Sequence, residues 1–130
     1  MSGGPVEGRL APCLRSPNCV SSQAVDPKHR VEPLRYRGAP GAAWDAALRA
    51  VEALPRTRVV EVRGDYLRAE ATSRLLRFVD DLELLHVPEE RAIHVRSASR
   101  LGYSDLGVNR KRVEALRRAL HRAGVGEPGA

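Results

Sequence analysis

Aromatic residues, lysine and long apolar runs are all scarce in this chain of 130 residues. Aromatics make up 4% of it, with one Trp and one Phe. No run approaches the roughly 20 apolar residues that a membrane-spanning helix needs. No basic stretch followed by an apolar segment resembles a signal peptide. We therefore expect one soluble domain and a cytoplasmic location.

The net charge of +6 is concentrated at the two ends of the chain. Residues 1–40 carry a net +3, residues 41–98 a net −1 and residues 99–130 a net +4. Basic ends can attract nucleic acid or another polyanion. However, no aromatic residues that could stack on bases accompany them, and Arg outnumbers Lys by 20 to 2, which indicates a coding bias. We therefore do not expect nucleic acid as a partner, and favour a solvated basic surface.

Gly and Pro separate the two ends of the chain from its ordered centre. Residues 1–12 have Gly or Pro at five positions, which predicts a disordered tail, and residues 124–130 predict another. Several Pro residues in residues 13–40 keep their predecessors out of the helical region. This part is predicted to be a loop arm, with an edge strand near Val31 and Leu34. Residues 13–123 are expected to form the domain.

Apolar side chains at three- and four-residue steps predict two helices, over residues 41–54 and 108–123. Pro55 ends the first helix and Gly124 ends the second. The apolar stripe of the first helix is Trp44, Ala47, Leu48, Val51 and Leu54. The inward stripe of the second helix is Asn109, Val113, Leu116 and Leu120.

Alternating apolar residues predict two β-hairpins. The first joins residues 58–63 to 66–71 through Gly64-Asp65, a two-residue turn. Its predicted pairs are Val62 with Leu67, Val60 with Ala69 and Glu61 with Arg68. The second hairpin joins residues 78–86 to 91–99. Its predicted pairs are His86 with Arg91, Leu84 with Ile93, Leu82 with Val95, Asp80 with Ser97 and Asp81 with Arg96.

Together these segments predict an α+β fold. The sheet is expected to be antiparallel and four- or five-stranded, with both helices packed on one face, in the order (β)-α-β-β-β-β-α.

Three stretches of the chain resemble a known family. They are Pro12–Ser22, Phe78–Asp81 and Arg96–Glu114, in that order. Together they resemble the family catalogued as domain of unknown function 1499, over roughly residues 12–120. The resemblance implies no reaction, no cofactor and no catalytic residue. Many members look exported or lipid-anchored, whereas this sequence shows no export segment.

Asp80 is the most informative candidate for a functional residue. A carboxylate on the apolar face of a strand is costly unless it is hydrogen-bonded or ion-paired. Its candidate partners are Ser97, Ser99, Arg100 and Asn109. We favour a structural interpretation, in which these groups form a polar cluster that fixes the second helix against the sheet.

The same groups have a functional interpretation as the lining of a ligand pocket. Arg96, Arg100 and Arg110 would then bind an anion near the start of the second helix. Tyr103 and Asp105 precede that helix and complete the candidate ligand-binding set, although capping of the helix is the simpler role for Asp105.

Cys13 and Cys19 have five residues between them, which does not match the short spacing typical of zinc ligands. Three roles stay open: packing in the arm, a disulfide, or a metal site completed by His29 and Asp26. A disulfide would not persist in a reducing cytosol. A nucleophilic Cys is disfavoured because the sequence places no base beside it.

The sequence therefore favours a small non-enzymatic module that binds an anionic ligand or a protein partner through the Arg96–Arg112 region. One alternative is a metal-binding or enzymatic protein that uses Cys13, Cys19 and a His. Another is a purely structural polar cluster with no site. The sequence identifies no cofactor.

Overall fold

The computed structural model describes residues 5–13, 18–74, 78–101 and 107–127. Its elements are, in chain order, β1 (Cys19–Ser21), β2 (Leu34–Arg35), α1 (Pro40–Glu52), β3 (Thr57–Arg63), β4 (Tyr66–Thr72), β5 (Val79–Val87), the 3-10 turn η1 (Pro88–Glu90), β6 (Ala92–Ser99) and α2 (Val108–Arg122). The predicted α+β class is confirmed. The antiparallel sheet has six strands because the arm supplies two of them.

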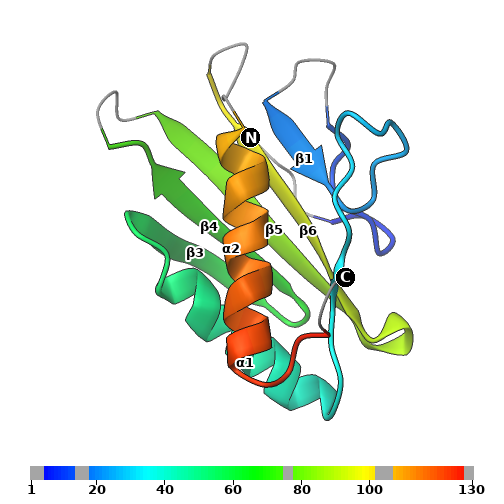
Figure 1. Cartoon of the computed structure of the whole chain (residues 1–130). Helices are drawn as coiled ribbons and strands as arrows, with labels where there is room; N and C mark the ends of the chain where they lie inside the picture. The colour runs from blue at the N-terminus through cyan, green and yellow to red at the C-terminus, as the bar shows by residue number, and fades with distance from the viewer. Residues whose placement is uncertain (1–4, 14–17, 75–77, 102–106, 128–130) are drawn as a thin grey trace.

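The sheet has the strand order β1-β6-β5-β4-β3, and β2 also pairs with β6. β1 contacts residues Arg96–Ala98 of β6 and β2 contacts Ala92 and Ile93, so the two short strands share one edge. Both helices lie over the same face of the sheet (Figure 1). We call this the helix face, and the opposite one the open face.

The hydrophobic core lies between the two helices and the helix face. The predicted stripe of α2 is buried along its whole length, from Asn109 to Leu120. It packs against fully buried strand residues, among them Leu67, Leu82, Leu84, Ile93 and Val95. Trp44 of α1 is partly buried and stacks on the ring of His86, with 5.5 Å between ring centroids. The buried stripe of α2 therefore places this helix directly over the sheet.

The first hairpin begins as predicted and then changes register. Val62 pairs with Leu67 and Glu61 with Arg68, but Ala69 pairs with Val59 rather than Val60. A β-bulge between Val59 and Glu61 places an extra residue in β3, so the predicted pair of Val60 with Ala69 was wrong.

The predicted register of the second hairpin was wrong by two residues. His86 pairs with Ile93, and Asp80 pairs with Ser99 rather than Ser97. The physical reason lies in the loop, where Arg91 ends η1 in the left-handed region with φ of 51° and does not join the ladder. A shift of two residues keeps each side chain on its predicted face, so Asp80 still faces the helices.

The N-terminal part of the described chain also differs from expectation. Cys19–Ser21, predicted to be loop, pairs with β6 as β1. Leu10 is only 6% exposed and packs against Tyr66 and Leu85 on the open face, although residues 1–12 were expected to form a disordered tail.

Neither helix in the described part of the chain has the length and the apolar composition of a membrane span.

Truncating the core tests this packing. We expect Leu84→Ala to lower the free energy of unfolding by about 2–5 kcal/mol, because it opens a cavity beneath the helices. Val62→Ala, at a half-exposed position of β3, should cost less than about 0.5 kcal/mol. Urea denaturation of both variants measures the difference, and equal costs would contradict the burial of Leu84 in the core.

Candidate functional site

A buried ion pair joins β5 to α2. Asp80 is 8% exposed, and its Oδ2 lies 2.8 Å from Nη2 of Arg112. Nη1 of Arg112 donates to Oδ1 of Asn109 at 2.7 Å and to Oγ of Ser97 at 3.0 Å. The carboxylate is therefore paired with a guanidinium that is itself hydrogen-bonded, as a buried charge requires.

Asn109 extends this network along β6 and to the residue that precedes β1. Its Oδ1 accepts the hydroxyl of Ser97 at 2.6 Å. Its Nδ2 donates to Oγ of Ser99 at 3.0 Å and to the carbonyl oxygen of Asn18 at 3.2 Å. We call Asp80, Ser97, Ser99, Asn109 and Arg112 the polar staple, because they fix the start of α2 against the sheet.

The structure thus brings Asp80, Ser97, Ser99 and Asn109 together, as the sequence suggested. Sequence reasoning missed Arg112 as the partner of Asp80. The available signal was its position three residues after Asn109, which places both side chains on neighbouring parts of one helix surface.

The expectation that Arg96, Arg100 and Arg110 converge on one anion was wrong. Arg100 lies on the open face, where its Nε is 2.8 Å from Oδ2 of Asp81. Arg96 lies on the same face, 3.2 Å from Oε1 of Glu83. The error arose because successive strand residues point to opposite faces, so Arg96 and Arg100 cannot share the side of Ser97 and Ser99.

Arg110 lies apart from the other two cations. Its guanidinium donates to the carbonyl oxygens of Arg30 at 3.0 Å and Lys28 at 3.2 Å. It therefore fastens α2 to the loop before β2. Tyr103 and Asp105, the remaining members of the predicted set, lie outside the described residues.

The open face carries a network of ion pairs around Asp81. Arg68 and Arg100 both contact its carboxylate, and Arg100 also lies 2.9 Å from Oε2 of Glu70. Burial alone would raise the pKa of Asp81, but the two guanidinium groups outweigh it and hold that pKa below its usual value. Hydrogen bonding from Arg100 is the main cause of a lowered pKa at Glu70.

Cys13 and Cys19 form a disulfide, with 5.6 Å between their Cα atoms. The disulfide is one of the three roles that the sequence left open, and because metal ions bind the thiolate form of cysteine, the alternative of a metal site does not fit the bonded pair. His29 Nδ1 lies 3.7 Å from Oδ2 of Asp26. Within the described ranges, no group of three or more His, Cys, Asp or Glu side chains is placed to hold a metal.

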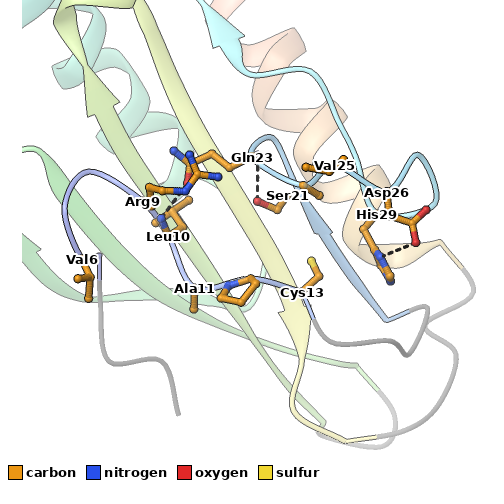
Figure 2. A pocket seen from close by; sticks show the side chains of 12 residues that line it. Val6, Arg9, Leu10, Ala11, Cys13, Ser21, Gln23, Val25, Asp26 and His29 are labelled. Carbon is orange, nitrogen blue, oxygen red and sulfur yellow. Dashed lines mark hydrogen bonds and ion pairs between the residues drawn. The ribbon is translucent and has the colours of Figure 1, made fainter.

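A cavity of about 730 Å³ lies between residues 6–13 and residues 21–29. Figure 2 shows it from close by. The N-terminal segment forms one wall, with Val6, Arg9, Leu10, Ala11, Pro12 and Cys13. The other wall consists of Ser21, Gln23, Ala24, Val25, Asp26 and His29.

The N-terminal wall is positioned by Leu10 and Gln23. The backbone N–H of Leu10 donates to Oε1 of Gln23 at 2.8 Å, and Nε2 of Gln23 donates to the carbonyl of Gly8 at 3.2 Å. Sequence reasoning missed this wall because one apolar residue among Gly and Pro gives no periodic signal. The only sequence feature that could have indicated an ordered wall was Leu10, a large apolar residue close to Pro12 and Cys13.

The cavity combines apolar walls with an uncompensated cation. Val6 is 70% exposed and Val25 is 93% exposed. Arg9 is exposed, and no carboxylate pairs with its guanidinium among the described residues. Asp26 and His29 lie across the cavity from Arg9 (Figure 2). One end of the cavity is therefore cationic, and the acidic group lies at the other.

Comparison with known proteins places the chain in a family. Residues 9–120 match the family model described as "Protein of unknown function (DUF1499)", so the chain belongs to this family, as its three motifs indicated. No curated protein matches the chain. No solved structure matches it either.

Removing Asp80 tests the polar staple. We expect Asp80→Ala to lower the free energy of unfolding by about 2–3 kcal/mol, because Arg112 stays buried without its carboxylate. Arg118→Ala, at an exposed position of α2, is the control and should cost less than about 0.5 kcal/mol. Chemical denaturation compares them. A cost for Asp80→Ala no larger than the control's would show that the pair does not hold α2.

The open-face network predicts a pH dependence of stability. The lowered pKa values of Asp81 and Glu70 add stability above the carboxyl pKa of the unfolded chain, about 4. This stability is lost as the pH falls through the pKa values that Asp81 and Glu70 have in the folded protein. Arg100→Gln should therefore lower the free energy of unfolding by about 1 kcal/mol at neutral pH. In acid, the difference in free energy of unfolding between wild type and variant should become smaller.

Thermal unfolding of wild type and Arg100→Gln across that pH range makes the measurement. Arg118→Gln removes a charge away from these carboxylates and should show no such narrowing. If the difference in stability between wild type and Arg100→Gln stayed constant across this pH range, the assigned ion pairs of Arg100 with Asp81 and Glu70 would be contradicted.

Proposed function

We propose that this protein is a non-enzymatic binding module for a small apolar molecule that carries one anionic group. The ligand occupies the cavity between residues 6–13 and 21–29. The observation that carries the proposal is the pairing of exposed apolar walls with Arg9, a cation that lacks a carboxylate partner among the described residues. The anionic ligand expected from the sequence is retained, and its site moves away from the Arg96–Arg112 region.

The apolar part of the ligand follows from the two valines. Val6 and Val25 are among the few large apolar side chains that the described chain leaves exposed, and both line this cavity. Small-molecule sites are typically concave and mainly apolar, with a few polar groups that fix orientation. Covering these side chains favours binding by about 25 cal/mol per Å² of apolar surface removed from water.

The anionic part follows from the distribution of charge. Arg96 and Arg100 are already paired with carboxylates, and Arg110 is hydrogen-bonded to backbone carbonyls. Arg9 keeps its charge available at the cavity. Because Asp26 lies across the cavity (Figure 2), the ligand's anion is expected at the Arg9 end and its apolar body between the valines.

One hydrogen-bonded chain resembles a catalytic triad, and its surroundings favour a structural role. Oγ of Ser22 lies 2.9 Å from Nδ1 of His94, and Nε2 of His94 lies 2.7 Å from Oε1 of Glu90. Ser22 is only 2% exposed, and its Oγ accepts the backbone N–H of Val95 at 2.8 Å. A nucleophile needs access to its substrate, so Ser22, His94 and Glu90 have a structural rather than a catalytic role.

Decanoate and 1-decanol form a matched pair of probes, because they differ only in the head group. In an NMR titration, decanoate should shift the amide signals of residues 6–13 and 21–29 and bind more tightly than 1-decanol. Arg9→Gln should weaken decanoate binding about fivefold, the value of an exposed ion pair of about 1 kcal/mol. Val25→Ser should weaken both probes.

Arg49→Gln, which removes an exposed cation from α1, is the control and should leave the affinity unchanged. If neither probe shifts the cavity amides, the proposed site is wrong. Equal binding of the two probes would overturn the anionic part of the ligand.

A further inference from the structure

We propose that the Cys13–Cys19 disulfide is a redox latch on the cavity, so that its reduction releases the N-terminal wall and lowers ligand affinity. This inference rests on the proposed function, because it concerns the regulation of the same site.

The Cys19 side of the bond is fixed without the disulfide. Cys19 is 4% exposed and pairs with Ala98 in the β1–β6 ladder. The preceding residue, Asn18, accepts the backbone N–H of Ser99 at 2.9 Å and Nδ2 of Asn109 at 3.2 Å. Val20 lies in the main hydrophobic core. Breaking the bond therefore leaves β1 in place.

The Cys13 side has much weaker anchors. Besides the buried side chain of Leu10, three hydrogen bonds among the described residues join residues 8–13 to the body of the protein, and two of them involve the single side chain of Gln23. The third is a 3.4 Å contact from Nη2 of Arg96 to the carbonyl of Pro12. Exposed hydrogen bonds contribute little net stability. The covalent bond and the buried side chain of Leu10 are therefore the two main constraints on this wall.

Cys13 is also the sulfur that a reductant can reach. It lines the cavity, and Figure 2 shows its sulfur on the side of the labelled cavity residues. Cys19, in contrast, is only 4% exposed and is not among the residues that line the cavity. Attack on Cys13 with Cys19 as the leaving group is thus the accessible direction of thiol–disulfide exchange.

The exchange needs a dithiol reductant, which supplies both electrons. One thiolate of the reductant attacks Sγ of Cys13, the Sγ–Sγ bond breaks, and Cys19 leaves as a thiolate that takes a proton from solvent. The second thiol of the reductant loses its proton and attacks the mixed disulfide, which releases Cys13 as a thiolate. The reductant ends as a disulfide, and the protein gains two thiols.

The freed wall loses the restraint of a short ring. The disulfide closes a ring of seven residues, Cys13 to Cys19, with a sequence separation of 6. The loop-closure entropy of such a ring sets an upper limit of about fiftyfold on the increase in wall opening after reduction. A ligand that contacts Val6 and Arg9 would then meet a wall that is closed for a smaller fraction of the time.

The experiment compares the full chain with its disulfide intact and after reduction by dithiothreitol. Amide hydrogen exchange at Leu10 reports on wall opening without any ligand, and decanoate titration reports on the cavity. Reduction should speed exchange at Leu10 and weaken decanoate, while exchange at core amides such as Leu84 stays unchanged. The double variant Cys13→Ser/Cys19→Ala should behave like the reduced protein and should not respond to dithiothreitol.

The outcomes separate the latch from the site itself. If decanoate binds the oxidised and reduced proteins equally and Leu10 exchange does not change, the latch is wrong and the cavity stands. If Leu84 exchanges faster by the same factor as Leu10, the bond stabilises the whole fold and the latch is overturned. If decanoate binds neither form, the proposed function fails, whereas faster exchange at Leu10 alone still supports a releasable wall.

Discussion

The arrangement of this fold depends on the buried contact between Asp80 and Arg112. Removing two charges from water is costly, and the cost is offset only where geometry and further hydrogen bonds satisfy both groups. Here Ser97 and Asn109 satisfy the guanidinium from two different elements. An apolar interface alone would allow α2 to slide or rotate on the sheet. The polar staple is satisfied in one position only, so it specifies where α2 begins.

The alternation of side chains along β5 and β6 separates this staple from the network on the open face. Asp80 and Ser97 face the helices, whereas Asp81, Arg96 and Arg100 face the other way. The strand cations are consequently neutralised by the strand carboxylates, and a net charge of +6 does not create an anion site at the centre of the sheet. Arg9, in a segment with no regular secondary structure, places a positive charge at a cavity without a carboxylate partner among the described residues.

Periodicity predicted what depends on local pattern and failed where the backbone departs from it. Both helices and the four long strands were recognised because their apolar spacing is regular. The register of the second hairpin was missed because no pattern reveals that Arg91 adopts a positive φ. Asp80 was identified from its place on an apolar face, but its partner Arg112 required the distance between α2 and β5. The cavity wall escaped prediction because Leu10 gains its burial from residues more than fifty positions away.

The disulfide links this unpatterned wall to the question of where the protein works. Disulfides persist in oxidising compartments and are reduced in the cytosol, and the cytoplasmic location expected from the sequence stays a prediction. The fold itself does not depend on the answer, because β1 is held by β6 and by the contacts of Asn18. Only the N-terminal wall depends strongly on the bond. The redox state of the surroundings would therefore leave the polar staple and the core unchanged and act on one of the two walls that contact the proposed ligand.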